Sequence, residues 1–326
     1  MNNQLAVATI SLGWHECHTL ESKLEAIKQS GIQGIELCDY DLTRYASHHR
    51  LDRKKAAELI GELCKDLKLT VVAYASFEKF EGQLKPLNER LEKAQEWCDI
   101  AARLGMDMIQ VSSNTDPEAN GDEAVIVSDL RSLAELGQCH EPPIRFAYEA
   151  LAFGVHVADW EESLRIVKLV DQKNFGLCLD TYHVLGRLWA DPSSHSGKRP
   201  GGDAAMRDTL QRFRDLCPPE RIFYIQLSDG EFANPPILPG HVAYDRDTEL
   251  LFSWCLYGRI FPLEREYGAY LPMEDILRTW LVESGWTGWV SMEVFHHSMR
   301  EETAGPTSWT VRAVLSWDRV QKMLEA

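Results

Sequence analysis

The chain has 326 residues, of which 44 % are hydrophobic and 26 % are charged, a composition typical of a globular protein with a large apolar core. Its formal net charge of −16 is spread along the sequence and would repel a polyanion, so nucleic acid is not an expected partner. No apolar stretch approaches the roughly 20 residues of a membrane span, and the first residues do not resemble a signal peptide. The eight cysteines include no C-x-x-C pair and are expected to be buried thiols of a cytoplasmic protein.

Short apolar runs alternate with longer amphipathic stretches along the whole chain. The predicted strands are Leu5–Ile10, Gly34–Cys38, Thr70–Ala75, Met108–Val111, Ile144–Tyr148, Phe175–Leu179, Ile222–Leu227 and Trp289–Val294. The clearest predicted helices are Leu20–Gln29, Arg53–Asp66, Leu87–Leu104, Asp159–Val170 and Asp275–Glu283. Eight βα units in series predict an α/β fold, a (β/α)₈ TIM barrel. A doubly wound open sheet is the competing architecture, but Ser11–Trp14 after the first strand is not the glycine-rich loop that it normally has.

Two connections are too long for plain barrel loops. One runs from His183 to about Ala204, and the other from Asp229 to about Pro272. The second is rich in Trp, Tyr and Phe, which favours a lid over the active face and not a disordered loop. We therefore expect a single TIM barrel domain over 1–326, with a lid-like loop at about 229–272.

Four successive predicted strands end on a residue that can bind metal: Glu149, Asp180, Gln226 and Glu293. Barrel enzymes keep their active sites at the carboxyl ends of the strands. Three carboxylates converging there would repel one another unless a cation shared them, and oxygen ligands suit hard divalent ions. For any one of these residues, capping of the following helix is the alternative, and Gln226 is the weakest of the four as a ligand.

Other residues are candidates for contact with a small-molecule substrate. His183 follows Asp180 by three and could act as acid, base or hydrogen-bond donor, while His241 on the lid-like loop is a weaker candidate. Arg259 could hold a substrate carboxylate, with Lys79 and Arg145 as alternatives.

Aromatic residues, among them Phe77 and Tyr148, could wall a cyclic substrate, although packing in the core is the alternative for most of them. The pairs His48–His49 and His296–His297 are not expected to bind metal together, because adjacent residues of a strand point to opposite faces.

Several motifs carry a family resemblance that extends over nearly the whole chain. They include Ser76–Gly82, Pro143–Leu151, Asn174–Thr181, Tyr224–Gln226, Pro239–His241, Gly268–Pro272 and Gly288–Glu293. Through them the chain resembles the xylose-isomerase-like barrels, a superfamily of sugar isomerases, epimerases and related metal enzymes, and within it the 3-dehydroshikimate dehydratases. The order Glu, Asp, Gln, Glu fits the dehydratases, whereas many sugar epimerases carry His at the position of Gln226.

The resemblance implies a lyase of quinate and shikimate catabolism that converts 3-dehydroshikimate to protocatechuate. It implies one divalent metal ion (Mg²⁺, Mn²⁺ or Co²⁺) bound by Glu149, Asp180, Gln226 and Glu293, and His183 as a substrate contact. His183 is the preferred acid or base, and Glu149 or Glu293 is the rival.

The alternative function is a sugar or keto-sugar isomerase or epimerase that uses the same metal-enediolate chemistry. Two departures from the dehydratase pattern leave the exact substrate open: Leu256 and Glu78 stand where arginine is common or frequent in the dehydratases. A non-catalytic binding barrel is disfavoured by the full ligand set. Metal identity and assembly into a homo-oligomer also stay open.

Overall fold

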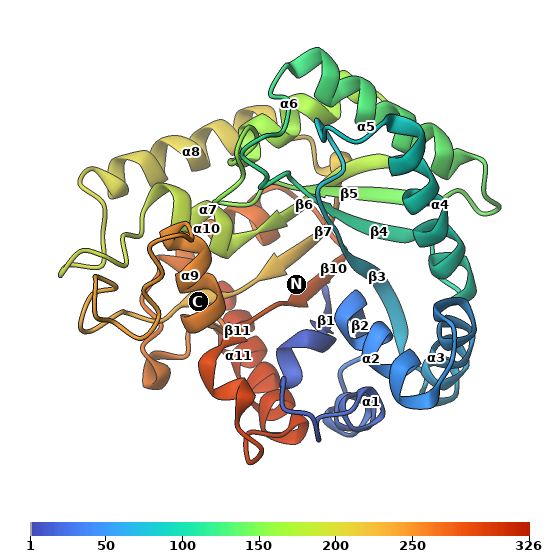
Figure 1. Cartoon of the computed structure of the whole chain (residues 1–326). Coiled ribbons are helices and arrows are strands. Elements are labelled where there is room, and N and C mark those ends of the chain that lie inside the picture. The colour runs from blue at the N-terminus through green and yellow to red at the C-terminus, as the bar shows by residue number, and fades with distance from the viewer. Residues whose placement is uncertain (1) are drawn as a thin grey trace.

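Eight parallel strands close into a barrel at the centre of the protein, in the order β1-β10-β7-β6-β5-β4-β3-β2 (Figure 1). The computed structural model describes residues 2–326. The barrel strands are β1 (Gln4–Ala8), β2 (Gly34–Cys38), β3 (Thr70–Phe77), β4 (Met108–Ser112), β5 (Arg145–Glu149), β6 (Phe175–Asp180), β7 (Ile222–Leu227) and β10 (Trp289–Met292). The predicted TIM barrel is confirmed, and the closure rules out the doubly wound open sheet.

The apolar strands are buried on both faces because helices cover the outside of the barrel and side chains fill its inside. Every residue of β2, β4 and β6 is buried. Small residues such as Ala6, Ala73 and Ala147 pack with Met108 and Tyr224 in one cluster. This filling makes the barrel a packed core, which leaves the carboxyl ends of the strands as the place for a site.

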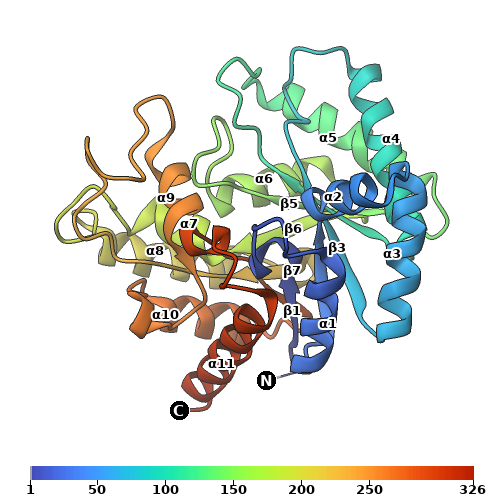
Figure 2. The same cartoon turned by 60° about the horizontal axis from the view of Figure 1, so that its bottom comes forward.

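Helices surround the barrel on all sides (Figure 2). They are α1 (Leu20–Ser30), α2 (Asp39–His49), α3 (Arg53–Leu67), α4 (Leu87–Arg103), α5 (Glu123–Gln138), α6 (Trp160–Val170), α7 (Thr181–Leu188), α8 (Gly202–Leu216), α9 (Leu250–Gly258), α10 (Met273–Arg278) and α11 (Pro306–Glu325). Several begin at a capping side chain, as α6 does where Asp159 accepts a hydrogen bond from the Glu162 N–H, 2.8 Å away. Among the described residues, no helix has both the length and the apolar character needed to cross a membrane.

The two long connections contain more regular structure than the sequence predicts. His183, where the sequence predicts the start of a loop, lies inside helix α7, because Asp180 at the end of β6 caps this helix directly. The segment 229–272 contains β8 (Asp229–Gly230), α9 and β9 (Arg259–Ile260). With β11 (Phe295–His296), β8 and β9 form a small antiparallel sheet in the order β11-β9-β8.

Candidate active site and metal centre

Four adjacent barrel strands bring together the residues that the sequence singles out as metal ligands. Glu149 and Asp180 are the last residues of β5 and β6, Gln226 lies near the end of β7, and Glu293 follows β10 directly. The strand register aligns Asp180 with Gln226. All four side chains are buried, and we call them the barrel cluster.

The two carboxylate oxygens of Asp180 contact different groups, the backbone of helix α7 and the guanidinium of Arg259. Oδ1 accepts hydrogen bonds from the backbone N–H groups of Tyr182 (2.6 Å) and His183 (3.3 Å), so it caps α7. Oδ2 is paired with the guanidinium of Arg259. The capping role considered from the sequence is therefore real, and it leaves one oxygen directed at the cluster.

Glu149 has an oxygen without a donor. Its Oε2 accepts a hydrogen bond from the Gln110 side chain, while Oε1 is buried and has no hydrogen-bond partner among residues 2–326. Oε1 lies 3.6 Å from Nε2 of His183. A buried carboxylate oxygen in this state is unfavourable, which suits a position that is completed by a cation.

Gln226 is oriented by a fifth polar side chain, Glu36. Oε1 of Glu36 accepts hydrogen bonds from Gln226 Nε2 and from the Tyr224 hydroxyl, both at 2.8 Å. The amide oxygen of Gln226 accepts a hydrogen bond from the Cys178 thiol at 3.2 Å and keeps a second lone pair. The sequence analysis missed Glu36; the signal was a glutamate inside the short, otherwise apolar strand β2.

Burial and mutual repulsion disfavour the charged forms of these carboxyl groups. Burial, and then the charges of Asp180 and Glu293, hold the pKa of Glu149 well above its usual range. Burial raises the pKa of Glu293 to about 8, against the opposing effect of Arg259. Burial also raises the pKa of Asp180. Carboxylate and amide oxygens, one of them without a donor, fit a hard divalent cation that would compensate these charges.

Arg259 provides the positive charge in the cluster. Its Nη2 pairs with Oδ2 of Asp180 and lies 3.0 Å from Oε2 of Glu293, and its Nε donates to the Ser228 hydroxyl at 2.7 Å. The side chain is 1 % exposed. Expected on a loop, Arg259 instead opens strand β9, and it is held by two of the proposed metal ligands.

His183 is held in one protonation form. Its Nδ1 accepts a hydrogen bond from the Ala152 backbone N–H at 3.1 Å, so the neutral ring carries its proton on Nε2, toward Glu149. Burial, and then the charge of Arg259, lower the pKa of His183 well below its usual range. His183, Glu149 and Asp180 each offer a donor atom within 4.8 Å of the other two. The geometry makes His183 a neutral hydrogen-bond donor.

A cavity of about 570 Å³ adjoins the cluster. Its lining includes His183, Arg259 and Glu293, together with the two positions that depart from the dehydratase pattern, Leu256 and Glu78. A neighbouring hollow of about 1130 Å³ shares Glu293, Leu256 and Glu78 with it. The cavity is large enough for a small cyclic substrate.

Some predicted substrate contacts lie elsewhere. Phe77 is buried against Trp97, with ring centroids 5.0 Å apart, and the Tyr148 hydroxyl donates to Glu81 Oε1 at 2.9 Å. Both face away from the cavity because Ser76 and Glu149, their strand neighbours, point toward it or toward the cluster. The expectation that Phe77 and Tyr148 wall the substrate is therefore corrected.

Two further candidates are also outside the residues that line the cavity. His241 packs beside Tyr257, with ring centroids 5.4 Å apart. Arg145 is the first residue of β5, at the amino end of the strand, where it pairs with Asp107 at 2.8 Å. Arg145 is therefore at the wrong end of the barrel to bind a substrate at the cluster.

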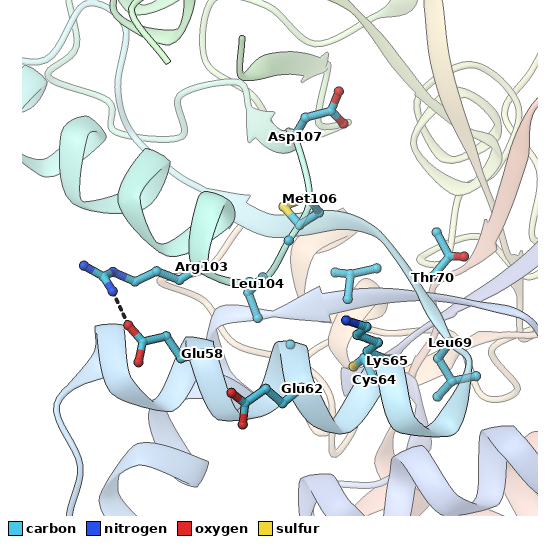
Figure 3. A pocket seen from close by; sticks show the side chains of 13 residues that line it. Glu58, Glu62, Cys64, Lys65, Leu69, Thr70, Arg103, Leu104, Met106 and Asp107 are labelled. Carbon is cyan, nitrogen blue, oxygen red and sulfur yellow. Dashed lines mark hydrogen bonds and ion pairs between the residues drawn. The ribbon is translucent and has the colours of Figure 1, made fainter. Parts of the chain in front are cut away.

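A pocket of about 630 Å³ lies at the opposite end of the barrel, beside the first residues of β3 and the residues that precede β4 (Figure 3). It is lined by side chains of α3 and by Arg103, which pairs with Glu58. Since residues of the amino ends of barrel strands usually serve stability, this pocket is not the candidate active site.

Comparison with known proteins identifies the fold family of this chain and several of its relatives. A family model described as xylose isomerase-like TIM barrel matches residues 24–315. The 3-dehydroshikimate dehydratase of Neurospora crassa is 37 % identical over 98 % of this chain and 94 % of that protein. A 3-dehydroshikimate dehydratase of Pseudomonas aeruginosa is 33 % identical over 93 % of this chain, which spans only 39 % of that longer protein. A solved xylose isomerase-like TIM barrel/4-hydroxyphenylpyruvate dioxygenase fusion protein matches 99 % of this chain and 43 % of its own, with 27 % identity and a TM-score of 0.77.

Proposed function

The chain belongs to the family of xylose isomerase-like TIM barrels, and on this premise we propose that it is a hydro-lyase that dehydrates 3-dehydroshikimate to protocatechuate. The observation that carries the proposal is the similarity to the Neurospora crassa 3-dehydroshikimate dehydratase, which extends over nearly the full length of both chains. The pathway that we propose is quinate and shikimate catabolism.

We assign the barrel cluster to one divalent cation, with Mg²⁺, Mn²⁺ and Co²⁺ as the candidates. Glu149, Asp180, Gln226 and Glu293 would hold it. The unpartnered Oε1 of Glu149 and the raised pKa values of Glu149 and Glu293 support this assignment. When bound, the cation would supply Lewis-acid stabilisation of the negative charge that develops on the substrate ketone oxygen.

The side chains of the chain itself supply the proton transfers. Glu293 lines the cavity and is our candidate for the base that removes the proton α to the ketone. The β-hydroxyl would leave as water with the proton that Glu293 takes from the α-carbon, while His183, with its proton on Nε2, would donate a hydrogen bond to the departing oxygen. A proton shift from the ring to the ketone oxygen would then give the aromatic product. Because its protonated Nε2 has no free lone pair, His183 is proposed as a substrate contact and not as a metal ligand.

The substrate carboxylate needs a positively charged partner, and two line the cavity. Lys79 lines the cavity, where its ammonium could bind an anion. Arg259 pairs with Asp180 and Glu293, and it would be free to bind the substrate carboxylate if a bound divalent cation neutralised these two residues instead. We propose that one of these two residues binds the substrate carboxylate in place of the arginine that the dehydratases commonly have at the position of Leu256.

The segment 229–272 is proposed to act as a lid within one barrel domain. Asp247, Thr248, Glu249 and Phe252 from this segment line the cavity, which supports the proposal. We further propose a cytoplasmic location, supported by the eight cysteines, all free and six of them buried.

The direct test is to incubate the purified protein with 3-dehydroshikimate and Mn²⁺ and to follow the ultraviolet absorbance of protocatechuate. We expect product with metal and none after chelation, with activity restored by Mg²⁺, Mn²⁺ or Co²⁺. Full activity in protein shown to be free of metal would overturn the metal assignment. If no protocatechuate forms while a keto-sugar is epimerised, the sugar isomerase or epimerase alternative replaces the dehydratase.

A further inference from the structure

A second group of metal-binding side chains lies on the small antiparallel sheet. Glu231, His296 and His297 each offer a donor atom within 4.8 Å of the other two. We call these three residues the outer cluster. None of them is among the residues that line the cavity beside the barrel cluster.

The pairing of the small sheet brings Glu231 and His296 together across Gly258. Gly258 forms an antiparallel bridge with His296 on one side, and its carbonyl accepts a hydrogen bond from the Glu231 N–H (2.7 Å) on the other. A Cβ atom at position 258 would lie 3.3 Å from Glu231 Oε2 and 3.2 Å from Glu231 Cβ. The missing side chain leaves the space into which Glu231 turns toward His296.

The contact between Glu231 and His296 is close but incomplete. His296 Nε2 lies 3.3 Å from Glu231 Oε2, yet this oxygen is buried and has no hydrogen-bond partner among residues 2–326. The His296 side chain is about nine-tenths buried, so its ring nitrogen is directed at the carboxylate from a fixed position. A cation between the two atoms would satisfy both.

His297 completes the group because the backbone turns at this point. His296 ends β11 and His297 begins a 3-10 helix, so the strand alternation that separates adjacent side chains does not apply, and the two rings lie 4.1 Å apart. The ring of His297 stacks on Tyr257 at 4.6 Å. This stacking fixes the imidazole of His297 beside His296 and Glu231, where it offers a donor atom to the same position.

Ser298 fixes the ring of His296 from the side of Nδ1. The Ser298 hydroxyl lies 2.7 Å from this nitrogen and the Ser298 backbone N–H lies 3.3 Å from it, so Nε2 is the atom that faces Glu231. In the metal-bound form the hydroxyl would accept the proton of Nδ1, which would free Nε2 as the ligand atom. We infer that the outer cluster is a second metal site, selective for a transition metal ion such as Zn²⁺, with two imidazoles and one carboxylate as ligands and a fourth position open to water.

The ligand chemistry separates this site from the barrel cluster. Two nitrogen ligands favour Zn²⁺, Co²⁺ or Cu²⁺ over Mg²⁺, whereas the barrel cluster offers oxygen ligands. An ion at the outer cluster would also tie β8 and β11 to the central strand β9, which carries Arg259. Occupancy should therefore stabilise the sheet that positions this arginine.

The test uses the full chain with the barrel cluster saturated by excess Mg²⁺. Cu²⁺ is added at one equivalent, and its electron paramagnetic resonance spectrum is examined for coupling to nitrogen nuclei. Zn²⁺ stoichiometry is measured in parallel by competition with a chromogenic chelator, and thermal unfolding with and without Zn²⁺ gives the stabilisation. We expect nitrogen coupling, one Zn²⁺ bound per chain in the presence of Mg²⁺, and a higher Tm with Zn²⁺.

Matched variants assign the signal to the outer cluster. His297→Gln and Glu231→Gln should each weaken Zn²⁺ binding at least tenfold and abolish the Tm rise, and His297→Gln should reduce the nitrogen coupling. His241→Gln, which changes a histidine beside Tyr257 but outside the cluster, should bind as the parent does. Unchanged Zn²⁺ affinity in both His297→Gln and Glu231→Gln, or no Zn²⁺ bound by the parent chain, would overturn the assignment.

Discussion

The barrel cluster and the outer cluster are built in opposite ways. The barrel cluster draws each side chain from a different strand of the closed barrel, all four residues being buried. In the outer cluster, His296 ends the two-residue strand β11 and His297 follows it, while Glu231 follows the two-residue strand β8. Its members Glu231 and His297 are half-buried. The first set is therefore fixed by the core of the fold, and the second by the pairing of short segments on its surface.

The chemistry differs in the same way. In the barrel cluster the carboxyl groups have raised pKa values because burial and mutual repulsion disfavour their charges, and Arg259 supplies partial compensation. In the outer cluster a single carboxylate faces two imidazoles. The comparison teaches that a cation at the barrel cluster would balance its buried charges, whereas a cation at the proposed outer site would chiefly join segments of the small sheet.

The largest effect is expected from removing charge at the barrel cluster. Glu149→Gln should lower kcat by about 10³-fold or more and reduce bound metal, because losing a ligand costs more than the roughly 10–100-fold typical of residues that only support ligands. Metal analysis and kcat on the same sample check this. Glu231→Gln makes the same chemical change in the outer cluster and should retain the turnover of the parent. Equal losses in the two variants would abolish the distinction between the clusters.

The next largest effect concerns Arg259 as the resident cation. Arg259→Ala leaves Asp180 and Glu293 without their buried partner, which typically costs about 3–5 kcal/mol of unfolding free energy. The loss should be large in the metal-free protein and smaller with Mn²⁺, which can neutralise the same carboxylates. Urea unfolding with chelator and with Mn²⁺ measures both values. A loss that metal does not change would show that Arg259 and the cation do not share a role.

His183 should affect the reaction and not the metal. His183→Ala is expected to lower kcat about 10²-fold, as loss of a hydrogen-bonding or acid–base group does, with metal content close to that of the parent. The reason is the Ala152 N–H, which occupies Nδ1 and leaves the proton on Nε2. Lost metal would make His183 a ligand, and unchanged kcat with metal retained would make it a bystander.

The barrel and the placement of its cluster could be predicted from the sequence because both follow from local patterns. Continuous apolar runs identify β5 and β6, and Glu149 and Asp180 are their last residues. Strand alternation applied from Glu149 also places Tyr148 on the opposite face, so that misassignment was avoidable. The position of Arg259 was not predictable, because it depends on the pairing of β9 with both β8 and β11, and these partners are distant in sequence.

The grouping of His296 with His297 in the outer cluster could not be predicted from the sequence either. Alternation within a strand correctly separates neighbouring side chains, but it says nothing of a residue that lies beyond the strand. His296 ends β11 and His297 already belongs to the following helix. The sequence gives no local sign of this boundary, since neither glycine nor proline marks it.

A buried carboxyl group outside both clusters gives the smallest expected effect and a control for the first prediction. Oε1 of Glu81 accepts hydrogen bonds from the Asn114 N–H (2.7 Å) and the Tyr148 hydroxyl (2.9 Å), while Oε2 is buried without a partner among residues 2–326. Burial raises the pKa of Glu81 to about 7. Glu81→Gln therefore keeps the accepting oxygen and removes only a charge that the surroundings do not favour.

The pH dependence follows from the sign of this shift. The folded-state pKa of Glu81, about 7, lies above the unfolded value of about 4.3, so its contribution to stability is complete below about pH 4 and is lost as the pH rises through 7. Relative to the parent, Glu81→Gln should gain about 2–3 kcal/mol of stability between pH 5 and pH 8. Urea unfolding of both proteins at the two pH values measures the difference. The opposite result would be a variant that loses stability relative to the parent between pH 5 and pH 8. The charged form of Glu81 would then stabilise the fold. Burial outside a cluster would then not set this carboxyl group apart from those of the barrel cluster.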